Sequence, residues 1–287
     1  MVDPCDMAPP KALKAAWEQA GVISHAASWT RQMGGHSNPV WRVRDNTDDV
    51  ICKLYHTNKF SPLFGNHPDH EVLALKALSG HGLAPDLISS LHSSAGPSVA
   101  YCYLAGPQWS GDVTAVAELL AKLHRQKIPE GLPVAPRLPQ GVIAQTHLMQ
   151  PARTSDAEQF LPPDACHLPI AENVFLHGDV VPGNLVQTDD GLRLIDWQCP
   201  AVGDPCLDIA IFLSPAMQII YGHRPLTAVE ISRFFDAYNQ PDVAQRYQAF
   251  APIFHYRMAA YCRWKGARGS AAHAAAAPIE QSAISRA

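Results

Sequence analysis

One stretch in the second half of this chain constrains its local structure more than any other. It reads FLHGDVVPGNLVQTDDGLRLIDWQCPAVGDPCLDIA and spans residues 175–210. The turn signal DDG at 189–191 stands between two short apolar segments, a pattern that predicts a β-hairpin. Asn184 and Asp196 lie six residues on either side of Asp190, so an antiparallel register centred there would place their side chains opposite one another at the open end of the hairpin.

The polar residues around this hairpin suit phosphoryl-transfer chemistry. Opposite residues in an antiparallel pair have Cβ atoms roughly 4.5–5.5 Å apart, a separation that one hard cation can bridge with an amide oxygen and a carboxylate. Asn184 and Asp196 therefore form an expected magnesium site. Asp179 precedes Asn184 by five residues, on the loop that enters the hairpin, where its carboxylate can act as a base beside the metal. Transfer of a phosphoryl group from ATP requires such a base and such a metal pair.

Two motifs in this stretch resemble those of a known family. HGDVVPGN followed by IDW looks like the catalytic loop and metal-binding signature of the aminoglycoside phosphotransferase and choline kinase superfamily, which shares the protein-kinase-like fold and uses ATP and Mg²⁺. The resemblance implies that Asp179 is the catalytic base and that Asn184 and Asp196 are magnesium ligands. It also implies that His177 shapes the catalytic loop and that Asp208, in GDPCLDIA, braces this loop as structural support.

Two other classes of kinase-like protein fit these motifs less well. Trp197 and Gln198 depart from the protein-kinase D-F-G, and GDPCLDIA follows Asp196 too soon for an activation segment, so a protein kinase is disfavoured. A non-catalytic nucleotide-binding protein would be expected to carry a broken motif, and every key position is intact here.

The rest of the chain fits an α+β, two-lobed, protein-kinase-like fold. After a short leading helix, residues 28–103 read as strands around one helix. Gly106 and Pro107 break the last strand, and helical periodicity follows. We therefore expect a nucleotide-binding lobe with a small antiparallel sheet over residues 1–104, a larger, mainly helical catalytic and substrate-binding lobe over 105–268, and a frayed low-complexity tail over 269–287.

A glycine-rich segment in the first half is the expected phosphate-binding loop. Gly34 and Gly35 allow backbone amides to approach phosphate oxygens. With Ser37 and Asn38 they look like the short G-G-x-x-N loop of choline-kinase-type enzymes. An ordinary glycine turn is the alternative.

Lys53 is the expected phosphate-binding lysine. It lies in the otherwise apolar strand VICKLY, where a buried ammonium without a partner would be costly, so we expect a carboxylate beside it. Glu71, at the start of the next predicted helix, is the preferred partner and matches the lysine–glutamate pair of kinase-like folds, although it could instead stabilise the helix dipole, and Asp69 could play either part. The resemblance also places the segment 101–104, with Tyr103, at the hinge whose backbone groups bind adenine.

Composition restricts the partners and the compartment. A net charge of −4 with 47% hydrophobic residues indicates a large core and no global basic footprint, so we expect neither nucleic acid nor a membrane as a partner, and no obligate protein partner is evident. The seven cysteines include no CxxC pair and read as reduced thiols. The N-terminal segment has no apolar run of the kind found in signal peptides or membrane spans. These features favour a cytoplasmic enzyme that acts on a small-molecule alcohol.

The residues after Asp208 bear on the phosphate acceptor. From residue 209 onward the chain has four acids and eight bases, an excess of positive charge that disfavours a polycationic aminoglycoside. Arg257, Tyr261 and Trp264 share a face at helical spacing, where aromatic rings could cage a quaternary amine or stack on a thiamine-like ring; their alternative role is to pack the helix against the core. A choline-, ethanolamine- or thiamine-like amino alcohol is therefore favoured, a sugar stays open, and an aminoglycoside is the alternative acceptor.

Overall fold

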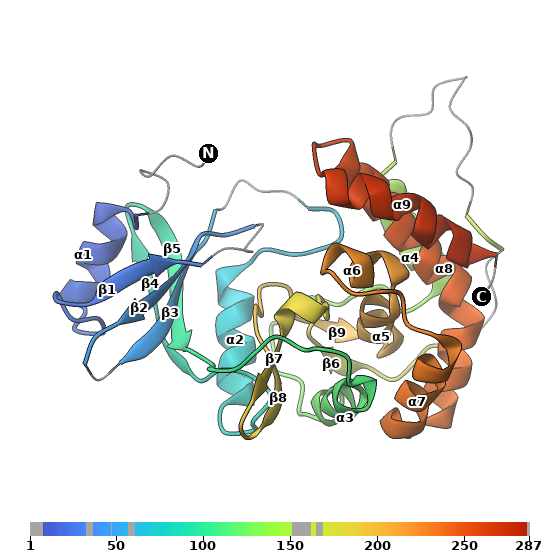
Figure 1. The fold of residues 1–287 in the computed structure, drawn as a ribbon, viewed down its shortest axis with the longest axis horizontal. Helices are drawn as coiled ribbons and strands as arrows, with labels where there is room; N and C mark the ends of the chain where they lie inside the picture. Colours follow the sequence, from blue (N-terminus) through green and yellow to red (C-terminus); the bar gives the residue numbers. More distant parts are fainter. Residues whose placement is uncertain are drawn as a thin grey trace. The chain divides into compact units, whose positions relative to one another are not determined.

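The computed structural model describes residues 8–32, 37–46, 48–56, 61–150, 162–164 and 169–285. The chain divides into two compact units. The first unit comprises residues 1–61, 65–107 and 186–199, and the second comprises residues 62–64, 108–185 and 200–287. The mixed α+β architecture, with an antiparallel N-terminal sheet and a mainly helical remainder, agrees with the fold class expected from the sequence (Figure 1).

The first unit is built on a five-stranded antiparallel sheet with the strand order β1-β2-β3-β5-β4. Its elements are β1 (Ser28–Arg31), β2 (Val40–Arg44), β3 (Asp49–Leu54), α2 (Pro68–Leu78), β4 (Leu87–Ser93) and β5 (Gly96–Cys102). The central strand β3 is rich in β-branched residues and is buried almost throughout, as expected for a strand with neighbours on both sides. Val40 of β2 pairs with Lys53 of β3, which fixes the lysine in the middle of the sheet.

A leading helix, α1 (Lys11–Gln19), covers part of this sheet. Leu13 and Trp17 lie four residues apart on one face of the helix, and both are buried in a core that includes Trp41. Trp17 Nε1 donates a hydrogen bond of 3.1 Å to Ser98 Oγ. The leading helix of the sequence prediction is thus an integral part of the first unit.

The predicted hairpin is present as β7 (Leu185–Thr188) and β8 (Gly191–Leu194), joined by the expected turn. Its paired strands stop short of the two residues proposed to meet at its open end. Asn184 closes the short 3₁₀ turn η2 (Pro182–Asn184), and Asp196 follows β8 with a left-handed φ of 64°.

The hairpin corrects the lobe boundary expected from the sequence. Residues 186–199 belong to the first unit, although the chain from 105 to 268 was expected to form one lobe. Gln187 N donates to Pro107 O at 2.9 Å. Gly106 permits this approach, because a Cβ at that position would lie only 1.9 Å from Gln187 O. The glycine and proline that break β5 therefore also create the contact with the hairpin, which a linear sequence division cannot reveal.

The second unit consists mainly of helices. They are α3 (Val113–Leu123), α4 (Pro139–His147), α5 (Cys206–Leu213), α6 (Pro215–Ile220), α7 (Ala228–Tyr238), α8 (Pro241–Gly266) and α9 (Ala271–Ile284). Two short strands, β6 (Val174–Leu176) and β9 (Ala201–Gly203), pair antiparallel among them. Within the described ranges, no helix is both long and apolar enough to span a membrane.

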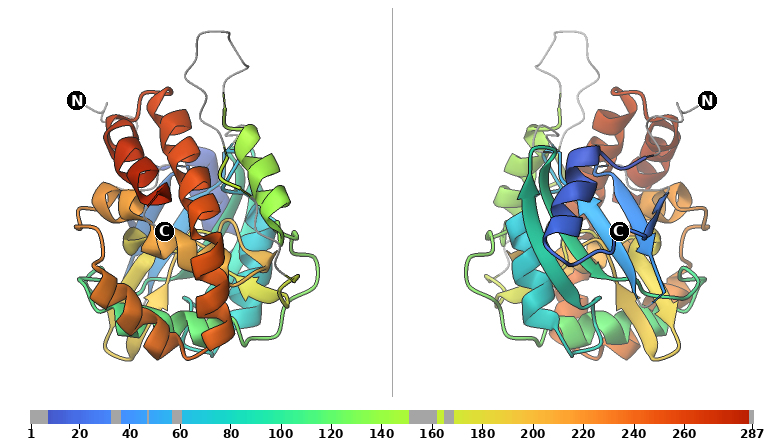
Figure 2. Two further views of the ribbon diagram at one scale, coloured as in Figure 1. Left: turned by 90° about the vertical axis from the view of Figure 1, so that its right-hand side faces the viewer. Right: turned by 90° about the vertical axis from the view of Figure 1, so that its left-hand side faces the viewer.

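The expectation of a frayed tail over residues 269–287 was wrong for most of its length. Helix α9 packs alongside α8, and Figure 2 shows the two helices side by side. Alanine favours the helix, and Ala276 and Ala277 are small enough to be buried at the contact. The buried Glu280 fixes the helix, because its carboxylate accepts hydrogen bonds from Ser214 Oγ at 2.7 Å and from Ala216 N at 2.9 Å. The alanine-rich composition of α9 therefore reflects its close packing against α8.

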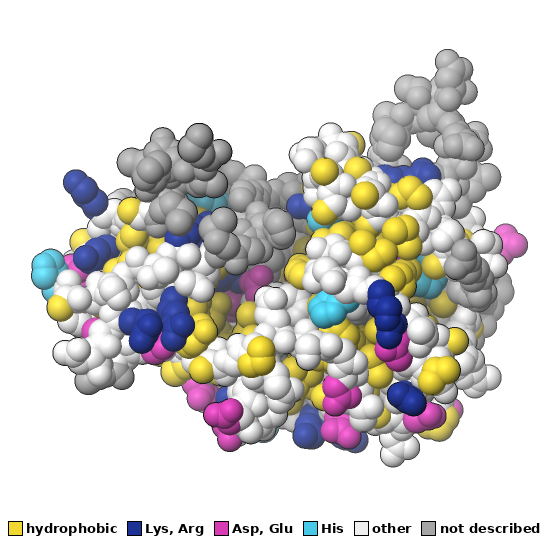
Figure 3. All heavy atoms as spheres, in the orientation of Figure 1, with side chains coloured by type: hydrophobic (Ala, Val, Ile, Leu, Met, Phe, Trp, Pro, Cys, Tyr) yellow, Lys and Arg dark blue, Asp and Glu magenta, His cyan; other side chains and the backbone are white. Residues whose placement is uncertain are grey.

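The charged side chains are dispersed on the face shown in Figure 3. There, lysines and arginines lie singly or in small groups among aspartates and glutamates. Among the described residues drawn in that view, the basic side chains do not gather into the single field that is typical of a nucleic-acid-binding surface.

Candidate active site

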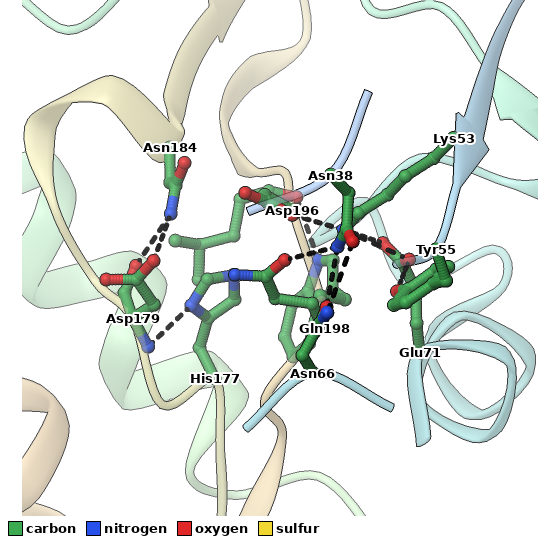
Figure 4. A network of polar contacts seen from close by, with 12 residues as sticks. Asn38, Lys53, Tyr55, Asn66, Glu71, His177, Asp179, Asn184, Asp196 and Gln198 are labelled. Carbon is green, nitrogen blue, oxygen red and sulfur yellow. Dashed lines mark hydrogen bonds and ion pairs between the residues drawn. The ribbon is translucent and has the colours of Figure 1, made fainter. Parts of the chain in front are cut away.

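Within the first unit, Lys53 lies between two carboxylates. Its Nζ is 3.2 Å from Glu71 Oε2, and it also donates a hydrogen bond to Asp196 Oδ1 (Figure 4). Lys53 is 1% exposed and Glu71 is fully buried, whereas the Asp196 side chain keeps 32% of its surface. The partner expected for Lys53 is therefore Glu71, while the alternative, Asp69, is exposed on the first turn of α2.

The electrostatics of this group favour a charged lysine. Burial by itself would lower the pKa of Lys53, but the carboxylates of Asp196 and Glu71 outweigh it, and the pKa is raised above its usual value. Burial raises the pKa of Glu71, an effect that Lys53 opposes. Removing one member of such a buried pair leaves an uncompensated charge, which makes the arrangement sensitive to substitution.

Tyr55 is a member of this group that the sequence analysis missed. Its hydroxyl donates a hydrogen bond to Glu71 Oε2 and helps to fix the carboxylate that faces Lys53. A signal was available in the sequence, because Tyr55 follows Lys53 by two residues and residues so spaced along a strand point to the same face.

Within the second unit, Asp179 and Asn184 lie together on the loop between β6 and the hairpin. Asn184 Nδ2 donates hydrogen bonds to Asp179 O at 2.9 Å and to Asp179 Oδ2 at 3.2 Å. Hydrogen bonds between the expected base, Asp179, and one expected metal ligand, Asn184, therefore stabilise the expected catalytic loop. His177 is fully buried, and its Nδ1 accepts a hydrogen bond of 3.2 Å from Asp179 N, so it is in a position to shape the loop.

Asp208 binds the backbone at the start of this loop. Its two carboxylate oxygens accept hydrogen bonds of 2.8 Å from the backbone N–H groups of His177 and Gly178. His124 Nε2 lies 3.2 Å from Asp208 Oδ2, and its Nδ1 lies 2.7 Å from the hydroxyl of Tyr238. His124 was not among the residues expected from the sequence, although it continues the buried face of α3 at helical spacing.

The glycine-rich segment is only partly described. Gly34 and Gly35 lie outside the described residues, while Ser37 is half-buried and Asn38 is buried. Asn38 Nδ2 donates to Gln198 Oε1 at 2.9 Å and to Asn66 Oδ1 at 2.6 Å. Asn38 is therefore tied to other protein side chains, among them one that follows Asp196 by two residues.

Tyr103, the expected hinge residue, lies half-buried at the end of β5. The guanidinium of Arg42 lies over its ring, 3.5 Å from the centroid, and is itself bound by both carboxylate oxygens of Asp49. Tyr103 N donates to Asp49 O at 3.0 Å. Its backbone N–H is therefore engaged with a neighbouring strand of the sheet.

The three residues considered for the acceptor lie together on α8, but two of them are buried. Arg257 is 3% exposed, and burial lowers the pKa of its guanidinium to about 10, an effect that the charge of Asp208 opposes. Tyr261 packs edge-on against Phe64, with ring centroids 4.9 Å apart, and Trp264 stacks against Tyr261. These contacts favour the alternative role of packing α8 against the core.

Comparison with known proteins identifies the family of this chain. A sequence profile described as the phosphotransferase enzyme family matches residues 28–250. The chain belongs to this family. A search of curated proteins gave no match.

Solved structures of other phosphotransferases share the fold. A choline/ethanolamine kinase family protein from Mesorhizobium loti aligns at 14% identity with a TM-score of 0.67, covering 96% of this chain and 93% of its own. A choline kinase from Cryptosporidium parvum aligns at 14% identity with a TM-score of 0.64, covering 96% and 92%. A thermostable mutant of the aminoglycoside phosphotransferase APH(4)-Ia, in a ternary complex with ADP and hygromycin B, aligns at 13% identity with a TM-score of 0.62, covering 94% and 96%. At these identities the similarity to solved structures shows only the fold of this phosphotransferase.

The side chains expected to hold magnesium in this phosphotransferase have suitable chemistry. Magnesium prefers hard oxygen ligands and usually takes one or two protein side chains together with phosphate oxygens. Asn184 and Asp196 supply an amide oxygen and a carboxylate, and among the residues that the structure describes no hydrogen bond reaches Asn184 Oδ1. In the same ranges, no group of three or more His, Cys, Asp or Glu side chains is arranged to hold a metal ion.

Proposed function

We propose that this phosphotransferase transfers the γ-phosphoryl group of ATP, with Mg²⁺ as cofactor, to a hydroxyl of a small molecule. The observation that carries the proposal is the buried Lys53 held between Glu71 and Asp196. A structural ion pair needs only one carboxylate. A lysine that contacts a nucleotide phosphate needs one carboxylate to fix its position, here Glu71, and a second, more exposed carboxylate nearby to bind the metal, here Asp196.

Each half of the chain supplies part of the chemistry. Lys53 would orient the phosphates, and Gly34, Gly35 and Ser37 would cover them with backbone and hydroxyl donors. Asn184 and Asp196 would hold the metal, which when bound supplies charge neutralisation on the phosphates.

Asp179 would act as the catalytic base. Asn184 Nδ2 and the His177 ring fix its carboxylate and its backbone, so that the base is oriented before substrate binds. The carboxylate accepts the proton of the acceptor hydroxyl, the hydroxyl oxygen forms a bond to the γ-phosphorus, and the bond from that phosphorus to the bridging oxygen breaks to release ADP.

The favoured acceptor is an amino alcohol of the choline, ethanolamine or thiamine type. The excess of basic residues after Asp208 disfavours a polycationic substrate, so an aminoglycoside is the second candidate. A non-catalytic nucleotide-binding role is the candidate from another class. We also propose a cytoplasmic location, which is supported by the use of ATP and by the free thiols of the five described cysteines.

A panel of acceptors tests this proposal directly. ADP release from Mg-ATP would be measured with choline, ethanolamine, thiamine, homoserine, simple sugars and kanamycin, using Asp179→Asn as the blank. We expect a signal that depends on the acceptor and is lost in the blank. A signal with kanamycin alone would favour the aminoglycoside candidate, and nucleotide binding without turnover on any acceptor would favour the non-catalytic role.

A further inference from the structure

Asn38 closes a network of side-chain amides in the first unit. It is 2% exposed, and it lies next to Asn66 and Gln198 in Figure 4. Its Nδ2 donates to Gln198 Oε1 at 2.9 Å and to Asn66 Oδ1 at 2.6 Å. Its Oδ1 accepts from His56 N at 3.1 Å and from Asn66 Nδ2 at 3.2 Å.

These contacts use the full hydrogen-bonding capacity of the Asn38 side chain. A carboxamide has two N–H donors and one oxygen with two acceptor positions, and here all four are paired with protein groups. A phosphate oxygen needs a donor, and both donors of Asn38 are already engaged in a buried place. We therefore no longer expect Asn38 to bind the nucleotide directly, and its contacts favour a role in positioning other protein groups.

The partners of Asn38 belong to segments that are far apart in the sequence. Asn38 itself is the last residue of the glycine-rich segment and lies two residues before Val40, which pairs with Lys53. Gln198 comes two residues after Asp196, and its backbone oxygen also accepts from His67 N at 3.3 Å. The amide network thus ties the end of the glycine-rich segment to the loop that carries Asp196.

We infer that Asn38 and Gln198 are positioning residues that hold the Asp196 carboxylate in place beside Lys53. The inference rests on the proposed function, because it assigns the pair to the binding of Mg-ATP. Asp196 has a left-handed backbone, which a residue other than glycine adopts only when its surroundings hold it there. The hydrogen bond from Asn38 to Gln198 is one of the contacts that hold this loop, and neither side chain needs to touch the nucleotide.

A double-mutant cycle on nucleotide binding tests the inference without knowledge of the acceptor. Calorimetry would measure the Kd of a non-hydrolysable ATP analogue, with magnesium and with a chelator, for the full-length wild type, Asn38→Leu, Gln198→Leu and the double variant. Gln198→Leu should raise the Kd with magnesium about tenfold, the cost typical of one lost buried hydrogen bond. Asn38→Leu should raise the Kd at least as much, because it also removes the contacts with His56 N and with Asn66. The double variant should bind no more weakly than Asn38→Leu alone, because the contact between the two side chains is already lost in that single variant. The chelator should shrink the effect, since it arises at Asp196.

A matched control keeps stability apart from positioning. Thr188→Val removes the hydrogen bond from Thr188 Oγ1 to Gly191 O within the neighbouring hairpin, so it should lower the Tm slightly and leave the Kd unchanged. If Asn38→Leu does not fold, Gln198→Leu decides alone, because Gln198 has no expected contact with phosphate.

Two results would overturn the inference, and a third, distinguishable from them, would contradict the proposed function. Weaker binding in Asn38→Leu with normal binding in Gln198→Leu would make Asn38 a direct nucleotide ligand. A lower Tm with unchanged Kd in both variants would reduce the contact to a purely structural one. Failure of the wild type to bind the analogue at all would instead contradict the proposed function.

Discussion

The carboxylate of Asp208 should be a strong support of the loop that carries Asp179. It is fully buried and accepts backbone hydrogen bonds of 2.8 Å from both His177 and Gly178. Asp208→Asn preserves the shape of the side chain but leaves one oxygen, so one backbone N–H faces an NH₂ group instead of an acceptor. A hydrogen bond to a charged group contributes about 1.5–3 kcal/mol, and the unpaired N–H adds a desolvation cost, so we expect a loss of about 3 kcal/mol.

Thermal unfolding followed by circular dichroism would measure this loss. For a unit of this size, about 1 kcal/mol shifts the Tm by roughly 2–4 °C, so Asp208→Asn should lower it by about 6–12 °C. Turnover should also fall, because the loop that carries Asp179 loses its support. Asp236→Asn is the matched control, since Asp236 is an exposed acid on α7, and its Tm should stay near the wild-type value. A Tm for Asp208→Asn within about 2 °C of the wild type would show that the loop does not depend on this carboxylate.

Three further predictions follow from the described contacts. Asp196→Ala should remove the magnesium dependence of ATP binding, and an unchanged magnesium titration would exclude Asp196 as a ligand. Gly183→Ala should lower both Tm and turnover, because a Cβ there would lie 2.3 Å from the Tyr221 ring; normal activity would show that the loop can yield. Glu280→Ala should lower the Tm by several degrees, because it leaves the Ser214 hydroxyl and the Ala216 N–H buried without an acceptor. An unchanged Tm would show that α9 does not depend on this carboxylate.

Local signals carried most of what the sequence could predict. The DDG turn predicted the hairpin, and the burial of a lysine in an apolar strand predicted a carboxylate partner, which the structure identifies as Glu71. The contact of Asp208 with the loop was expected only from the resemblance to a family, because no local rule links residues that are about 30 positions apart.

The features that were missed depend on contacts between distant segments. Asn38 and Gln198 are 160 positions apart, and no periodic pattern in the sequence indicates that two amide side chains form a buried pair. The alanine-rich tail was expected to fray because its composition is simple, yet Glu280 and the small faces of α9 give it a buried contact surface. The hairpin was assigned to the wrong half because sequence order does not report that Gly106 admits the backbone of Gln187.

The central claim is that Asp179 acts as the base in phosphoryl transfer. Asp179→Asn keeps the size of the side chain and removes its ability to accept a proton, so the most direct measurement compares the kcat of this variant with its Kd for the Mg-nucleotide. We expect a kcat below a few per cent of the wild-type value with a nearly unchanged Kd. A variant that retained more of its turnover than this would contradict the assignment of Asp179 as the base.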